Sequence, residues 1–116
     1  MEFDVHRTTA LGRPALRVRG ELDIATAPRL AEAVESQLSR QPQSLVVDLT
    51  DTTFMDSSGA RQLARIARRA AADGVSLEVV CPSANRPVRL VVDLLDLRAL
   101  VPIVESPSLT DDEVRP

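Results

Sequence analysis

The sequence predicts a single α/β domain, in which a mixed sheet of about four or five strands carries about three main helices packed mostly on one face. Two observations lead to this fold class. Short runs rich in apolar residues alternate along the chain with longer segments whose apolar residues recur at helical spacing. The length of 116 residues suits one hydrophobic core but not two.

The chain opens with a predicted antiparallel strand pair. Residues 3–8 and 14–19 each alternate apolar and polar side chains, and Gly12 lies near the turn between them. We expect the second strand to end at Gly20. Residues 45–49 are almost continuously apolar, which is typical of a central strand whose two faces are both covered.

Three segments are predicted to be helices. Residues 26–38 start with Thr26 as the capping residue and then carry apolar residues at helical spacing. Residues 59–73 have the clearest apolar face, and Gly74 follows them, where glycine readily adopts the left-handed conformation that ends a helix. Residues 87–97 give the third helix.

Two further strands complete the sheet, at residues 75–81 and 100–104, and the second is an edge strand because Pro102 cannot donate to a ladder. Right-handed crossovers bring the loops that follow parallel strands to one edge of the sheet. We assign residues 1–105 to the domain and residues 106–116 to a flexible C-terminal tail.

Composition excludes several classes of function. The formal net charge is −3 and the chain has no Trp or Tyr, so we expect no direct binding of nucleic acid, which needs a basic surface or stacking aromatics. No apolar run approaches the length of a membrane span. Cys81 is the only cysteine and borders an apolar run, so we predict a buried thiol, which fits a reducing cytoplasm. We expect no membrane partner.

The segment Asp56-Ser57-Ser58-Gly59 is the strongest candidate for a functional site. It lies between the central apolar strand and the most regular helix, which places an exposed serine where a helix begins. Two interpretations are open at this point. The serine caps the helix, as serine commonly does, or Ser57 carries a phosphate that the free N–H groups of a helix start favour.

Other charged side chains are candidates for the same site. Asp23 and Asp56 each follow a predicted strand, so we expect them to lie close together. Asp23 contacts a partner, holds the Ser57 loop or only caps its own turn, whereas Asp56 either orients the Ser57 hydroxyl or only bonds backbone amides in its own turn. Arg61 and Arg65, with Arg68, fall on one helix face and form a basic stripe that is either solvated surface or complementary to an acidic partner.

Enzymatic chemistry is not expected. His6 is the only histidine and the chain contains no lysine, so Ser57 has no evident catalytic base. The sequence offers no glycine-rich phosphate loop and no cluster of Cys and His ligands. We therefore predict no catalytic residues, no metal and no cofactor, and we assign His6 no chemistry.

The site segment belongs to a wider pattern that resembles the STAS domain of bacterial anti-sigma-factor antagonists. The resemblance covers nearly the whole chain, and it rests on Gly20-Glu21-Leu22-Asp23, Thr26-Ala27, Val47-Asp48-Leu49 and Phe54-Met55-Asp56-Ser57-Ser58-Gly59. It implies that Ser57 is phosphorylated by a partner anti-sigma factor with kinase activity, that the unmodified form binds this partner, and that a phosphoserine phosphatase reverses the change.

The residues expected to contact the partner are Asp23, Asp56, Ser57, Ser58, Gly59, Arg61 and Arg65. The chain departs from the family pattern at Ala60-Arg61, where an apolar residue and a glycine are usual, and at Asp96, where glycine is frequent. The alternative function is a constitutive scaffold subunit of a stress-signalling or lipid-transport complex. The free protein is expected to be a monomer, because no long apolar stripe is evident.

Overall fold

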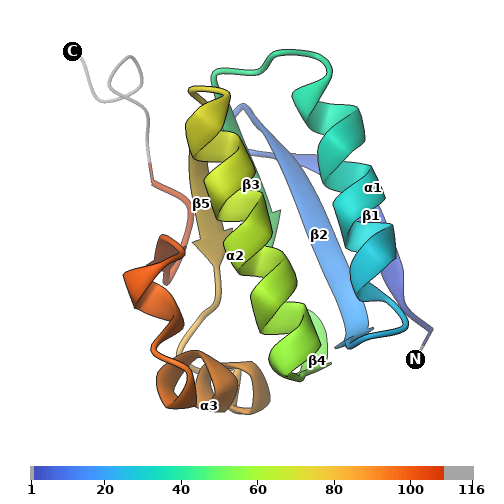
Figure 1. The fold of residues 1–116 in the computed structure, drawn as a ribbon, viewed down its shortest axis with the longest axis vertical. Helices are drawn as coiled ribbons and strands as arrows, with labels where there is room; N and C mark the ends of the chain where they lie inside the picture. Colours follow the sequence, from blue (N-terminus) through green and yellow to red (C-terminus); the bar gives the residue numbers. More distant parts are fainter. Residues whose placement is uncertain (1, 109–116) are drawn as a thin grey trace.

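The computed structural model describes residues 2–108, and Figure 1 shows the path of the chain. The elements in chain order are β1 (Asp4–Ala10), β2 (Arg13–Leu22), α1 (Ala27–Leu38), β3 (Ser44–Asp48), β4 (Thr52–Met55), α2 (Ser57–Ala72), β5 (Ser76–Val80), α3 (Arg86–Leu94), the short 3₁₀ helix η1 (Leu97–Ala99) and β6 (Ile103–Val104). The predicted α/β fold with three main helices is confirmed.

The strands form one mixed sheet. Its strands lie in the order β1-β2-β3-β5-β6, and β4 pairs with β2 beyond the end of β3. β1 and β2 are antiparallel, as predicted, and the remaining pairs are parallel. β4 was not predicted, and β2 extends beyond its predicted end at Gly20. β2 continues past an irregularity between Gly20 and Glu21 and pairs its last residues with β4.

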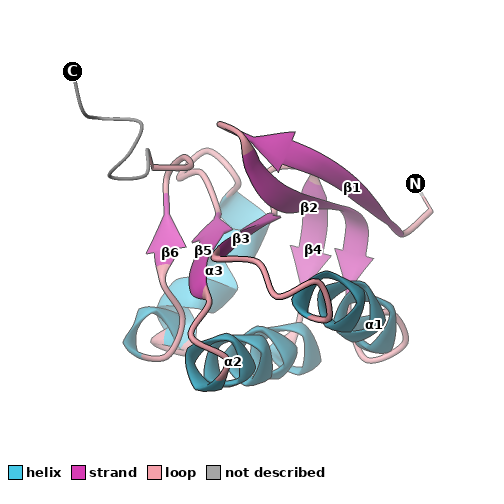
Figure 2. Cartoon of the chain, turned by 90° about the horizontal axis from the view of Figure 1, so that it is seen from above, coloured by secondary structure: helices cyan, strands magenta, loops and turns pink. Residues whose placement is uncertain are grey.

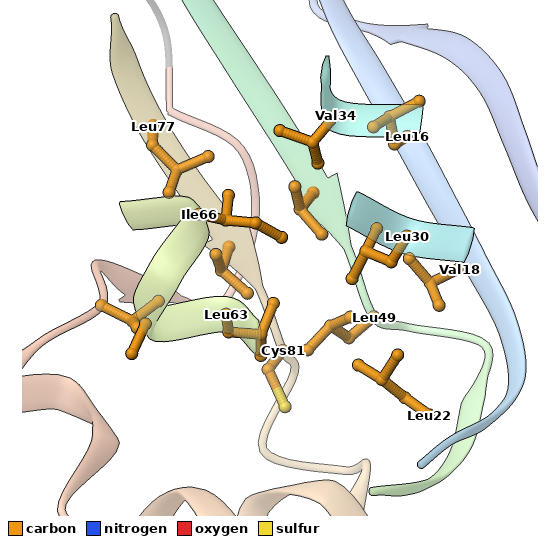
Figure 3. Packing of buried hydrophobic residues seen from close by; sticks show 14 of the residues in the cluster. Leu16, Val18, Leu22, Leu30, Val34, Leu49, Leu63, Ile66, Leu77 and Cys81 are labelled. Carbon is orange, nitrogen blue, oxygen red and sulfur yellow. The ribbon is translucent and has the colours of Figure 1, made fainter. Parts of the chain in front are cut away.

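The two longer helices cover one face of the sheet. Figure 2 shows α1 and α2 side by side over that face, while α3 crosses near the edge where the parallel strands end. Both long helices are amphipathic, so each buries its apolar stripe against the sheet. In Figure 3, Leu30 from α1 lies beside Val18 of β2, and Leu63 from α2 lies near Cys81; all belong to one core cluster.

The predicted burial of Cys81 is confirmed, since its side chain is fully buried in this core. Burial raises the pKa of the Cys81 thiol, an effect that the nearby Arg89 only partly opposes. A protonated, buried thiol is a poor nucleophile.

Several helix ends differ in detail from the expectations. Thr26 occupies the position before α1, but its side chain caps no helical N–H. Its hydroxyl donates instead to the carbonyl oxygen of Glu21 at 2.7 Å. α2 ends before Gly74, which has the predicted positive φ of 70°. α3 is shorter than predicted because Asp96 adopts the left-handed conformation at φ 49° and ψ 46°, which explains why glycine is the more usual residue there.

The face of the sheet opposite α1 and α2 carries a partly buried ion pair. Arg13 Nη1 lies 2.7 Å from Glu78 Oε1 and also donates to the carbonyl oxygen of Ser108 at 2.8 Å. The predicted tail from residue 106 therefore starts with a segment that contacts the sheet, and residues 109–116 lie outside the described residues. No helix in the described part of the chain has the length and apolarity needed to cross a membrane.

Candidate functional site

The candidate site lies at the edge where β2 and β4 end. Leu22 and Met55 are paired residues of these two strands, and the backbone N–H of Asp56 donates to the carbonyl oxygen of Leu22 at 3.3 Å. Asp23 and Asp56 therefore follow directly from neighbouring strand ends. The structure brings the two predicted segments together at the start of α2, as Figure 1 shows at the lower end of that helix.

Asp23 bonds within its own turn. One carboxylate oxygen, Oδ1, accepts from the backbone N–H groups of Ala25 at 3.0 Å and Thr26 at 3.1 Å. The Asp23 N–H in turn donates to the Thr26 hydroxyl at 2.9 Å. These bonds order the loop between β2 and α1, so Asp23 shapes the site, and its second oxygen, Oδ2, makes no hydrogen bond within residues 2–108.

Asp56 is the N-cap of α2. Its Oδ1 accepts from the backbone N–H groups of Ser58 at 2.9 Å and Gly59 at 3.0 Å, two of the donors that a helix start leaves unpaired. The helix therefore begins at Ser57 and not at Gly59 as predicted. The interpretation of Ser57 as the capping residue is wrong, because the carboxylate before it already takes that role.

Ser57 is exposed as the first residue of α2. Its hydroxyl makes no hydrogen bond to any group within residues 2–108, so the fold does not use it. Ser58 is half-buried, and its hydroxyl lies 3.5 Å from Nη2 of Arg61. The two adjacent serines thus differ, and only the first presents an unengaged hydroxyl to solvent.

Gly59 is buried because α2 approaches β2 and β4 closely at this point. A Cβ added to it would lie 2.6 Å from the carbonyl oxygen of Leu22 and 2.8 Å from Cγ of Met55. No real Cβ tolerates such distances, so the absence of a side chain sets how near Ser57 lies to the strand ends. Gly59 was predicted only as part of the motif, and the structure shows that it is needed because α2 lies so close to Leu22 and Met55.

A basic face runs along α2 from the site. Arg61 and Arg65 are both exposed, and so is Arg68, as their spacing along the helix predicts. None of these three forms an ion pair with another group among residues 2–108. Their charges are therefore available to a partner that approaches the first turns of α2.

Two exposed apolar side chains near the ends of β2 and β4 were not predicted. Ile24, directly after Asp23, is 75% exposed, and Phe54 on β4 is 45% exposed. An isoleucine in a polar turn and one of only two phenylalanines in the chain were the available signals. Phe54 alternates along β4 with Met55, whose side chain packs under α2, so Phe54 points to the face of the sheet away from α2.

A cavity of about 820 Å³ lies elsewhere, and its lining includes His6, Arg17 and Asn85 but not Ser57. Its wall is formed partly by β1, the edge strand that contains His6. Among residues 2–108 there is no group of three or more His, Cys, Asp or Glu side chains that could hold a metal ion.

Comparisons with known proteins identify the pattern. A family model described as the STAS domain matches residues 5–108. Anti-sigma-F factor antagonist RsfB of Mycobacterium tuberculosis is 38% identical over 53 residues, which is 46% of this chain and 43% of that protein. Anti-sigma-B factor antagonist of Listeria monocytogenes is 43% identical over 42 residues, 36% of this chain and 37% of that protein. The matches thus span less than half the length of these curated relatives.

Among solved structures, an anti-sigma factor antagonist from Mycobacterium paratuberculosis superposes with a TM-score of 0.72 at 26% identity. The superposition covers 97% of this chain and 92% of that one.

Proposed function

This chain belongs to the STAS domain family, and on that premise we propose that it is an anti-sigma-factor antagonist. In the proposed cycle, the unphosphorylated form binds an anti-sigma factor with serine kinase activity and so releases a sigma factor. Phosphorylation of Ser57 ends the binding, and a phosphoserine phosphatase restores it. The proteins similar to this chain that carry the same functional name support the proposal. In this role the chain binds and is modified without catalysing a reaction, and it acts in the cytoplasm, where transcription takes place.

The observation that carries the proposal is the state of Ser57. Its hydroxyl is exposed on the first turn of α2 and is unengaged within residues 2–108, because Asp56 caps the helix instead. A phosphate can therefore be added without breaking a hydrogen bond of the fold. The partial positive charge at the start of the helix also favours the phosphate, so the modified domain stays folded.

The charges around Ser57 explain how a phosphate would act on binding. The exposed Arg61 and Arg65 favour an acidic partner surface along the first turns of α2. Phosphorylation adds about −1.5 to −2 charge beside that surface. For one pair of like charges about 6 Å apart, at an effective dielectric constant of about 20, the repulsion is about 3 kcal/mol. This free energy corresponds to roughly a hundredfold loss of affinity.

An exposed apolar side chain next to Asp23 supplies another part of the proposed interface. Ile24 is 75% exposed, and burying an exposed isoleucine fully against a partner contributes about 1.5–3 kcal/mol. Ile24 lies in the loop that follows β2, and the end of β2 is bonded to the segment before Ser57 through the Asp56 N–H and the carbonyl oxygen of Leu22. We therefore expect a partner that covers Ile24 to lie close to the Ser57 hydroxyl. Modification of this hydroxyl therefore acts beside the proposed contact.

The test is a quantitative capture from native lysate with four baits: the unchanged chain, Ser57→Ala, Ser57→Asn and Ser57→Asp. Asparagine has the size of aspartate without its charge, so this pair separates repulsion from bulk. Captured proteins are identified by mass spectrometry, and a captured kinase-like protein is then purified and incubated with the chain and ATP. We expect the Ala and Asn baits to retain the partner, the Asp bait to lose it, and the phosphate to map to Ser57.

Equal capture of one set of proteins by all four baits would contradict the switch and favour a constitutive scaffold subunit. Phosphate transfer to another residue would contradict the assignment of Ser57. A thermal melt of the phosphorylated chain provides a further check, because a large loss of stability would mean that the phosphate acts by unfolding.

A further inference from the structure

The outer face of α3 carries exposed leucines. Val88 and Val92 are fully buried and hold the helix against the domain, whereas Leu90 is 59% exposed and Leu94 is 73% exposed on the opposite side. Figure 1 shows α3 at one end of the molecule, beyond the lower ends of the strands. The expectation of a monomer rested on the absence of an apolar stripe, and α3 supplies one.

Charges of opposite sign bracket these leucines. Arg86 is the first residue of α3 and Asp93 is next to its last, and both are exposed. They are seven residues apart, so at about 3.6 residues per turn they lie on the same flank of the helix, within about 20° of each other. Pro87 and Leu94 have the same spacing and define the other flank. Leu90 lies between the flanks, in the middle of the exposed face.

This arrangement is complementary to itself when two copies meet antiparallel. The two-fold axis lies between the two helices at the level of Leu90 and is perpendicular to both helix axes. Rotation about it reverses the helix direction and places each flank beside the same flank of the second copy. Arg86 lies about 6 Å before Leu90 along the helix axis, and Asp93 lies about 4.5 Å after it. The rotation therefore sets Arg86 beside Asp93 of the second copy, twice, and sets Leu94 beside Pro87 of the second copy.

We propose that the face formed by Arg86, Pro87, Leu90, Asp93 and Leu94 binds the same face of a second copy of this chain. Leu90 meets its own copy at the two-fold axis, and the two ion pairs fix the antiparallel register. Antiparallel helices also align their dipoles favourably. Such a contact is isologous, because one patch serves both subunits, and it closes at the dimer.

The charges on α3 favour a second copy of the chain over other binding partners. Arg86 has no ion-pair partner within residues 2–108, and Asp93 is paired only with Arg98, at 2.9 Å, in an exposed bridge. A partner of one charge sign would satisfy one end of α3 and repel the other. A copy of α3 in the reverse direction satisfies both ends. Because the helix has only 9 residues, the contact is small, and we expect a weak dimer that forms at micromolar to millimolar concentration.

The test is sedimentation equilibrium of the purified full chain across that concentration range, with no partner protein present. Its outcome is thus independent of the proposed binding of an anti-sigma factor. Leu90→Asp sets two carboxylates against each other at the two-fold axis and should abolish dimer formation. Leu11→Asp is the matched control, since Leu11 is 49% exposed in the turn between β1 and β2, and it should leave association unchanged.

Charge reversal tests the register. Arg86→Asp and Asp93→Arg each replace two attractive pairs with two repulsive ones, and each should weaken dimerisation by about tenfold. The double variant restores opposite charges at both ends and should return the dissociation constant to within about threefold of the original. Arg68→Asp on α2 is the control for a general effect of net charge.

A chain that stays monomeric throughout the range would overturn the proposal, and so would association that survives Leu90→Asp. Failure of the double variant to recover association would overturn the antiparallel pairing of Arg86 with Asp93. All substituted side chains are exposed, so circular dichroism should show an unchanged fold for each variant.

Discussion

Replacing Gly59 with alanine should destabilise the protein, although the same change in most helices does the opposite. Gly59 lies in the first turn of α2, where alanine favours the helix over glycine by about 1 kcal/mol. Its Cβ, however, would lie 2.6 Å from the carbonyl oxygen of Leu22 and 2.8 Å from Cγ of Met55. The Met55 side chain can move, but the Leu22 carbonyl belongs to the β2 backbone and accepts a hydrogen bond from Asp56.

The magnitude follows from these opposing contributions. Overpacking a buried site costs about 1–3 kcal/mol, and contact with backbone rather than a flexible side chain puts Gly59→Ala near the upper end. Subtracting about 1 kcal/mol for helix propensity leaves a net loss of about 2 kcal/mol in the free energy of unfolding. Because the start of α2 must move away from β2, the variant should also displace Ser57 and weaken capture of the proposed partner.

Urea denaturation followed by circular dichroism measures the loss directly. The difference between Arg68→Gly and Arg68→Ala, at an exposed position of the same helix, gives the propensity contribution without a clash. A Gly59→Ala variant that is as stable as the original chain, or more stable, would refute the argument that the close approach of α2 to β2 requires glycine.

Two other predictions concern the cap of α2 and the opposite face of the sheet. Asp56→Ala removes the acceptor of two backbone N–H groups and should lower the free energy of unfolding, measured by urea denaturation, by about 1–2 kcal/mol. Asp56→Asn should keep most of the stability. Equal losses for both variants would mean that capping is not the role of Asp56. Burial raises the pKa of Glu78, but hydrogen bonds from Ser108 and Arg13 outweigh it, so the pKa is lowered in the folded state. Its contribution is therefore present above the pKa of an unfolded glutamate and is lost as the pH falls through the folded value. The stability advantage of the original chain over Glu78→Gln should shrink on acidification, and an advantage that grows at low pH would contradict this assignment.

Local sequence patterns predicted much of the fold. The alternation in β1 and β2, the apolar run of β3 and the helical spacing in α2 each record which faces a segment buries, and burial is a property that a single segment can encode. Gly74 marked the end of α2 for a similarly local reason, because glycine adopts positive φ without strain. The order of strands and helices then limited the topology to a mixed sheet with its loops gathered at one edge.

The sequence was less informative wherever the structure of one segment depends on its contacts with a distant segment. β4 is short, and it is a strand because β2 continues beside it past Gly20. The sequence left open whether a serine or the preceding aspartate caps α2, and backbone geometry decided for Asp56. The exposed face of α3 could not be predicted either. A helix rich in Val and Leu is expected to be buried, and only the packing of neighbouring elements determines which side they cover.

The sequence by itself determined the fold class, the motif around Ser57 and the basic face of α2, because period, residue type and spacing lie within single segments. The tertiary structure alone decided that Asp56 does the capping and so leaves the Ser57 hydroxyl unengaged within residues 2–108, and that Gly59 permits the close approach of α2. Those properties depend on distances between the backbones of β2, β4 and α2, which are set by packing across the chain and leave no periodic trace in the order of residues.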